Sequence, residues 1–178
     1  MFAKIYRVDR IVTLLNIVAL GLIGLAPFVA RLIAEKGPAG FTFADAARTA
    51  GVSAAAPYRH FRDRDDLLAS IAQRGFEQFE QVLTAAWDDG RPDTVTAFAR
   101  IGKAYLNFAR TEPAFYSAMF ESGIPVDSSP ELAAAGERAF AVIRAAAERL
   151  AALTPPGVTR PPAMMMALHI WSLAHGVA

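Results

Sequence analysis

Apolar residues recur at every third or fourth position along most of the chain, which is the spacing of an amphipathic helix. No stretch alternates between apolar and polar residues as a half-buried β-strand does. Turn-forming glycines, prolines and aspartates separate the helical stretches. The pattern therefore predicts an all-α protein with helices over seven stretches, residues 43–50, 54–61, 67–83, 94–110, 112–120, 131–153 and 164–178.

The strongest local signals surround the first two of these helices. Thr42 precedes the first helix and Asp45 stands three positions later, which is the spacing of a capping box. Gly51 suits the left-handed turn that ends a helix, and the Ser53 side chain can cap the second helix. Pro57 lies in the first turn of that second helix, where a missing N–H costs little. Two short helices joined by such a tight turn predict a helix-turn-helix.

Composition and charge add two points to this picture. The chain has no cysteine, which excludes disulfides, thiolate zinc sites and cysteine nucleophiles and is what we expect of a cytoplasmic protein. Residues 1–76 carry ten basic and six acidic side chains, whereas residues 77–178 carry eight and eleven. A basic N-terminal part on an acidic body suggests a polyanionic partner.

Residues 11–30 carry no charge, and their length and polarity match a membrane span. The basic residues before them would suit a signal peptide or a cytoplasmic anchor. Two glycines and Pro27 interrupt the stretch, and no cleavage site is convincing. The alternative is that residues 27–36 end a first helix that packs on the helix-turn-helix, preceded by an unusual extension or a wrongly assigned start of the reading frame.

The second helix of the pair has the composition of a helix that reads DNA. The major groove accepts an α-helix and shows a distinct pattern of donors and acceptors for each base pair. Ala54 and Ala55 would allow a close approach of the helix tip. Tyr58, Arg59 and His60 can donate hydrogen bonds to phosphates or base edges. These residues predict a DNA-binding surface.

At this point the chain resembles a known family. The fragments that carry the resemblance follow one another at the spacing of TetR/AcrR-type DNA-binding domains over residues 31–75: Ile33-Ala-Glu-Lys-Gly37, Phe41-Thr-Phe, Ala46-Ala, Ala50-Gly-Val-Ser53, Tyr58-Arg-His-Phe61 and Asp63-Arg-Asp-Asp-Leu-Leu68. Near the end of the chain, Trp171 with His175-Gly176 is similar to the WHG subgroup of that family.

The resemblance implies a domain order and a set of DNA contacts. Residues 31–76 would form a three-helix DNA-binding domain after an atypical apolar segment, residues 1–30. Residues 77–178 would form a helical ligand-binding and dimerisation domain that lacks the family's last helix. Thr42, Tyr58, His60 and Arg64 match positions that usually hold phosphates, and Ala54, Ala55 and Arg59 match positions that face bases. We add Ser53, at the helix start, to these DNA-binding candidates.

The same resemblance implies a homodimer that binds a palindromic operator. It would repress transcription until a ligand changes the spacing of its two DNA-binding domains. Large aromatic residues in the second half are candidates to line the ligand pocket, although such residues at helical spacing are more often plain core. The candidates are Phe98, Tyr105, Phe108, Phe115, Phe120, Trp171 and His175. They favour a small apolar or aromatic effector.

Other functions are less well supported by the residues. His169 and His175 fall on different helical faces, so we expect no metal site and no cofactor. Acidic residues pair with no nearby His or Ser in a catalytic arrangement, so we expect no enzyme. Two alternatives stay open, a membrane-associated protein anchored through residues 11–30 and a ligand-binding bundle that has lost operator binding.

Overall fold

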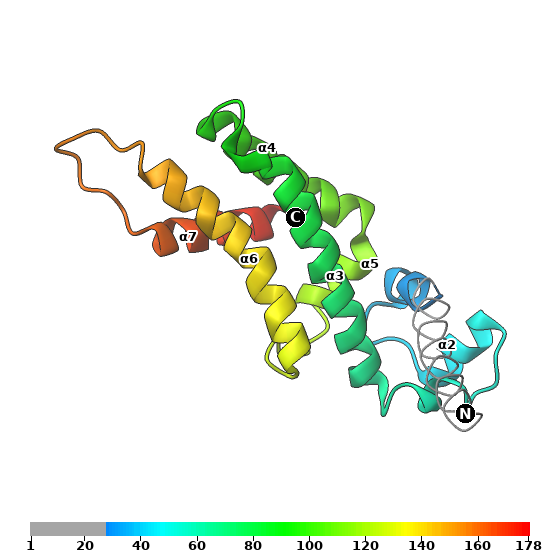
Figure 1. Cartoon of the computed structure of the whole chain (residues 1–178). Helices are drawn as coiled ribbons and strands as arrows, with labels where there is room; N and C mark the ends of the chain where they lie inside the picture. Colours follow the sequence, from blue (N-terminus) through cyan, green and yellow to red (C-terminus); the bar gives the residue numbers. More distant parts are fainter. Residues whose placement is uncertain (1–27) are drawn as a thin grey trace, which may run out of the picture. The chain divides into compact units, whose positions relative to one another are not determined.

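The computed structural model describes residues 28–178, and every regular element in that range is a helix. The described residues divide into two compact units, residues 28–68 and residues 69–178. The elements, in chain order (Figure 1), are a helical stretch over residues 28–36, α2 (Phe43–Ala50), the 3₁₀ helix η1 (Pro57–Arg59), α3 (Arg64–Trp87), the 3₁₀ helix η2 (Asp88–Gly90), α4 (Thr94–Thr111), α5 (Pro113–Phe120), α6 (Pro130–Ala151) and α7 (Ala163–Val177). The predicted all-α fold is confirmed.

The predicted membrane span concerns residues 11–30, of which only residues 28–30 lie within the described range. Those three residues belong to the helical stretch over residues 28–36. Within residues 28–178, no helix combines the length and the apolar character that crossing a bilayer requires.

Helix α2 begins and ends at the predicted residues because both of its ends are capped. The Thr42 hydroxyl oxygen accepts a hydrogen bond from the Asp45 backbone N–H at 3.2 Å. The Asp45 carboxylate in turn accepts one from the Thr42 backbone N–H at 3.0 Å, which completes the capping box. Gly51 ends the helix with φ of 70°, a left-handed conformation that glycine adopts without steric cost.

Replacing Thr42 with alanine is expected to destabilise the N-terminal unit by about 1 kcal/mol, because the Asp45 N–H loses its acceptor at a helix start. Thermal unfolding followed by far-UV circular dichroism measures this loss. Thr49→Ala, inside the same helix, is the matched control and should change stability by less than about 0.5 kcal/mol. Equal effects of the two substitutions would contradict the capping role of Thr42.

The α-helix predicted over residues 54–61 is wrong. Only Pro57–Arg59 is helical there, and it is a 3₁₀ helix. The Ser53 carbonyl oxygen accepts from the Ala56 N–H at 2.9 Å. In an α-helix this oxygen would accept from residue 57, but proline has no N–H to donate. The predicted cap by the Ser53 side chain is also wrong, since the 3₁₀ helix follows Ala56 and has no side-chain cap.

Helix α3 is longer than predicted at both ends. It begins at Arg64 rather than Leu67 and continues to Trp87 rather than Leu83. Its first turn is capped by Asp63, whose carboxylate accepts from the Asp66 N–H at 2.8 Å. The boundary between the two compact units lies within this helix.

In the second unit, α4 packs against α5, α6 and α7, and α6 crosses α7 (Figure 1). The buried face of α4 consists of Ala97, Ile101, Tyr105 and Phe108. Near the start of the helix Val95 is 58% exposed, whereas Ala97 is fully buried.

Two contacts set the packing of α3 within this unit. The Phe79 ring is fully buried, and its centroid lies 5.0 Å from those of Tyr105 and Phe108 on α4. Gly75 allows a second close approach, because a Cβ built there would lie 2.7 Å from the Met119 sulfur on α5. The absence of a side chain at this point lets the two helices meet.

Candidate nucleic-acid interface and ligand cavity

The segment that follows α2 carries most of the predicted DNA-binding residues, and most of them are exposed. Pro57 and Phe61 are buried and anchor the segment to its unit. Tyr58 between them is 63% exposed, and its ring meets that of Phe43 edge-on at 4.7 Å. The other exposed candidates are Ser53, Ala54, Ala55 and Arg59.

Arg59 differs from the other cations of this surface because it forms no ion pair with any residue that the structure describes. Arg48 pairs with Asp45, and Arg62 pairs with Asp66 at 3.0 Å. Hydrogen bonds from Thr42 hold the pKa of Asp45 below its ordinary value, and hydrogen bonds from Arg62 do the same for the pKa of Asp66. These two carboxylates are therefore ionised at neutral pH, and they offset the charges of Arg48 and Arg62, whereas Arg59 has no such partner among the described residues.

The remaining candidates are more constrained. The Thr42 hydroxyl is exposed, but its proton is directed to the Asp45 carboxylate at 2.9 Å. The Arg64 guanidinium donates to the Ala39 carbonyl oxygen at 3.1 Å. His60 is half-buried, and its Nδ1 atom is enclosed without a hydrogen-bond partner among the described residues.

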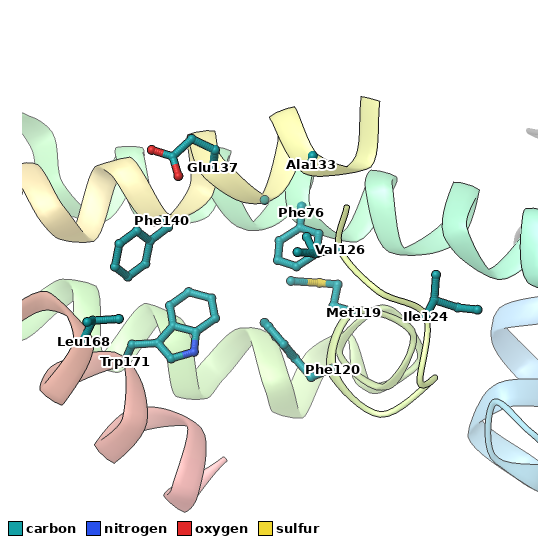
Figure 2. A pocket seen from close by; sticks show the side chains of 11 residues that line it. Phe76, Met119, Phe120, Ile124, Val126, Ala133, Glu137, Phe140, Leu168 and Trp171 are labelled. Atoms are coloured by element: carbon teal, nitrogen blue, oxygen red, sulfur yellow. The ribbon is translucent and has the colours of Figure 1, made fainter. Parts of the chain in front are cut away.

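A cavity of about 510 Å³ lies between helices of the second unit. Figure 2 shows Phe140, Trp171 and Leu168 at one end and Phe76 with Phe120 towards the other. Its volume falls within the range of small-molecule sites, roughly 300–1,000 Å³. The complete lining is Phe76, Met119, Phe120, Ile124, Val126, Ala133, Gly136, Glu137, Phe140, Leu168 and Trp171.

Only Phe120 and Trp171 of the predicted ligand-binding residues line this cavity. Tyr105 and Phe108 are almost fully buried in the core around Phe79. The other three lie outside the lining: Phe98 and Phe115, which are half-buried, and His175.

His175 joins a small polar cluster instead. Its Nδ1 atom lies 2.7 Å from the Tyr116 hydroxyl and 3.3 Å from the Tyr105 hydroxyl. Burial raises the pKa of both tyrosines, so the hydroxyls stay protonated over the physiological range. The cluster links α4, α5 and α7 and borders a second, smaller cavity of about 270 Å³.

Sequence reasoning missed most of the cavity lining. Phe76 and Phe140 contribute rings from α3 and α6, and Met119 adds its thioether. Helical spacing marks these residues as inward-facing, but it marks the core residues in the same way. Gly136 carried a weak signal, since a glycine inside an alanine-rich helix often marks a close approach. A Cβ there would lie 2.9 Å from the Val126 side chain.

Within residues 28–178, His, Asp and Glu side chains form no group that could hold a metal ion. Two family models match the chain. The first, described as bacterial regulatory proteins of the tetR family, covers residues 30–71. The second, described as a tetracyclin repressor-like C-terminal domain, covers residues 98–178. Among the curated proteins, none matches the chain.

Solved structures share this fold over most of their length. A protein with unknown function from Rhodococcus sp. RHA1 is 25% identical, with a TM-score of 0.73, covering 88% of this chain and 80% of that one. The TetR family transcriptional regulator PfmR from Thermus thermophilus is 21% identical, with a TM-score of 0.69 and coverages of 85% and 82%. A tetR family transcription regulator from Shewanella sp. PV-4 is 19% identical, with a TM-score of 0.64 and coverages of 86% and 81%.

Proposed function

This chain belongs to the TetR family of transcriptional regulators, and from that premise we propose that it is a repressor that binds a palindromic operator as a homodimer and is released by a small molecule. The observation that carries the proposal is the exposed segment between α2 and α3, with Arg59 as its unpaired cation among the described residues. An exposed guanidinium without a carboxylate partner is available to the O6 and N7 acceptors of guanine.

The other DNA contacts follow from the placement of the candidates. Ser53, Ala54 and Ala55 are exposed and small, which permits the backbone to approach the groove. The proposed phosphate partners are Tyr58, His60, Thr42 and Arg64. The arginines paired with carboxylates can also exchange partners for phosphates, because exposed ion pairs contribute at most about 1 kcal/mol.

Homodimer formation is supported by the exposed apolar side of α7. Leu173 and Val177 are 71% and 75% exposed, and Met165 is 51% exposed. A two-fold dimer would bury these side chains in both copies.

The effector response is supported by the 510 Å³ cavity, whose lining is almost entirely apolar. Clefts of this kind bury most of the surface of a drug-sized ligand. We propose that this cavity, with Phe120 and Trp171, is the effector site. The wall behind it would be supported by Tyr105 and His175, because the Tyr105 ring meets that of Trp171 and the His175 ring meets that of Phe120.

Binding of the full chain to DNA from its own upstream region, measured by fluorescence anisotropy across a salt series, tests the repressor function. The expected Kd is about 10⁻⁸ M or tighter at physiological salt. Random DNA should bind at least roughly a thousandfold more weakly, and the affinity should fall with salt as phosphate contacts release counterions. Sedimentation should give a dimer.

Leu173→Asp should give a monomer that binds the operator poorly, whereas Val95→Asp, which changes another exposed apolar residue, should leave both properties intact. The repressor function would be refuted if the unaltered chain forms a folded dimer that does not discriminate between upstream and random DNA. That result would instead support a ligand-binding bundle that has lost operator binding.

A further inference from the structure

The cavity lining contains one charged side chain, Glu137, and that charge is already paired. Arg144, two turns further along α6, places its Nη1 atom 2.8 Å from Glu137 Oε1. Arg144 is not among the lining residues. In Figure 2 the Glu137 carboxylate is turned away from the rings of Phe140 and Trp171. The cavity therefore presents apolar groups together with a neutralised carboxylate at its edge.

We propose that the cavity takes an uncharged aromatic molecule and that Arg144 strengthens this preference by neutralising Glu137. This inference rests on the effector site proposed above and names the chemical class of its ligand. Arg144 thus contributes to specificity through Glu137 without lining the cavity.

The preference for an uncharged ligand follows from the cost of burying a charge. A carboxylate or ammonium that leaves water without a partner loses far more hydration energy than an apolar wall returns. The aromatic rings would attract an ammonium through cation–π contact, but this attraction is smaller than the hydration it replaces. The Glu137 side chain is 60% exposed at the edge of the cavity, so it would attract a cation weakly if it were unpaired, and Arg144 removes that attraction.

The preference for an aromatic ligand follows from the arrangement of the rings. Trp171 meets Phe140 at 5.6 Å and Phe120 at 5.5 Å, both edge-on. Phe120 meets Phe76 in the same way at 5.6 Å. A planar ring bound in the cavity beside them can make further edge-to-face contacts, which stabilise aromatic pairs beyond the area they bury.

The test uses N-phenyl-1-naphthylamine, a neutral dye that fluoresces in apolar sites, with the full chain. Three molecules with the same ring system are tested for their ability to displace the dye: 1-naphthalenemethanol, 1-naphthylmethylammonium and 1-naphthoate. We expect the alcohol to compete at least about tenfold better than either ion. Ala133→Phe, which fills the cavity, should abolish dye binding while the circular dichroism spectrum stays helical.

Two further variants test the role of Arg144. Arg144→Gln frees the Glu137 carboxylate and should strengthen competition by the ammonium about threefold to fivefold, the size expected for a solvent-exposed charge pair. Glu137→Gln in the same background should remove that gain. Arg138→Gln removes another arginine of α6, one that pairs with Glu80 and lies outside the lining, and it should leave competition by all three molecules unchanged, which separates a charge effect at Glu137 from a disturbed fold.

The outcomes distinguish this inference from the function on which it rests. If the dye does not bind the unaltered chain, or if Ala133→Phe leaves its binding unchanged, the proposed effector site itself is refuted. If the dye binds in the cavity but the ammonium competes as well as the alcohol, the site stands and the uncharged class is overturned. If Arg144→Gln leaves the ammonium unaffected, the role of Arg144 is overturned.

Discussion

Replacing Phe79 with alanine is expected to destabilise residues 69–178 by about 3–5 kcal/mol, the cost of removing a large ring from a packed core. The ring is fully buried, and it meets Tyr105, Phe108 and Trp171 with centroids 5.0, 5.0 and 6.4 Å away. These partners lie on two different helices, α4 and α7. They therefore cannot move together to fill the cavity that the missing ring would leave. Urea unfolding followed by tryptophan fluorescence measures the change.

Val82→Ala is the control, because Val82 lies on the same helix but is 36% exposed. It should alter the free energy of unfolding by less than about 0.5 kcal/mol. A loss below about 1 kcal/mol for Phe79→Ala would mean that the four rings are not a tightly packed core.

Arg59→Ala should reduce the discrimination between the operator and base-changed operators by about 1–3 kcal/mol, because a side chain that contacts a base edge contributes specificity. Arg64→Ala should instead weaken binding to all DNA sequences about equally. Its guanidinium is held by the Ala39 carbonyl oxygen, which suits a fixed phosphate contact. Anisotropy titrations with both kinds of DNA measure the two effects.

Salt dependence separates the two roles further. Losing a phosphate contact should lower the slope of log affinity against log salt by about 1, as expected for Arg64→Ala. Arg62→Ala is the comparison variant for this slope. Arg62 is 86% exposed, pairs with Asp66 and is not one of the DNA-binding candidates. Equal losses of specificity from the Arg59 and Arg64 substitutions would overturn this division of roles.

The elements that could be predicted from the sequence are those whose ends are fixed by neighbouring residues. Helix α2 has the predicted bounds, because Thr42, Asp45 and Gly51 act within a few positions of one another. The stretch after Ser53 could not be predicted in the same way. Pro57 is tolerated in a first helical turn, but here it diverts the Ser53 carbonyl into a turn with Ala56.

The cavity lining was harder to predict because periodicity finds the buried face of a helix but not the space that the face borders. Tyr105 and Phe120 carry the same sequence signal, yet one lies in the core and the other lines the cavity. What distinguishes them is how α4 and α5 pack against α3 and α7. That packing depends on contacts such as Gly75 with Met119, which are distant in the sequence.

The contact between Gly75 and Met119 also determines how the methionines respond to oxidants. Met164, outside the surface proposed for the dimer, is 47% exposed, so peroxide can oxidise its sulfur without disturbing the core. Met119 is 8% exposed, and its sulfur lies where even a Cβ at position 75 would not fit. A sulfoxide oxygen there would separate α3 from α5 and place a dipole on the cavity wall. Oxidation of Met119 would therefore damage the cavity, whereas oxidation of Met164 would not.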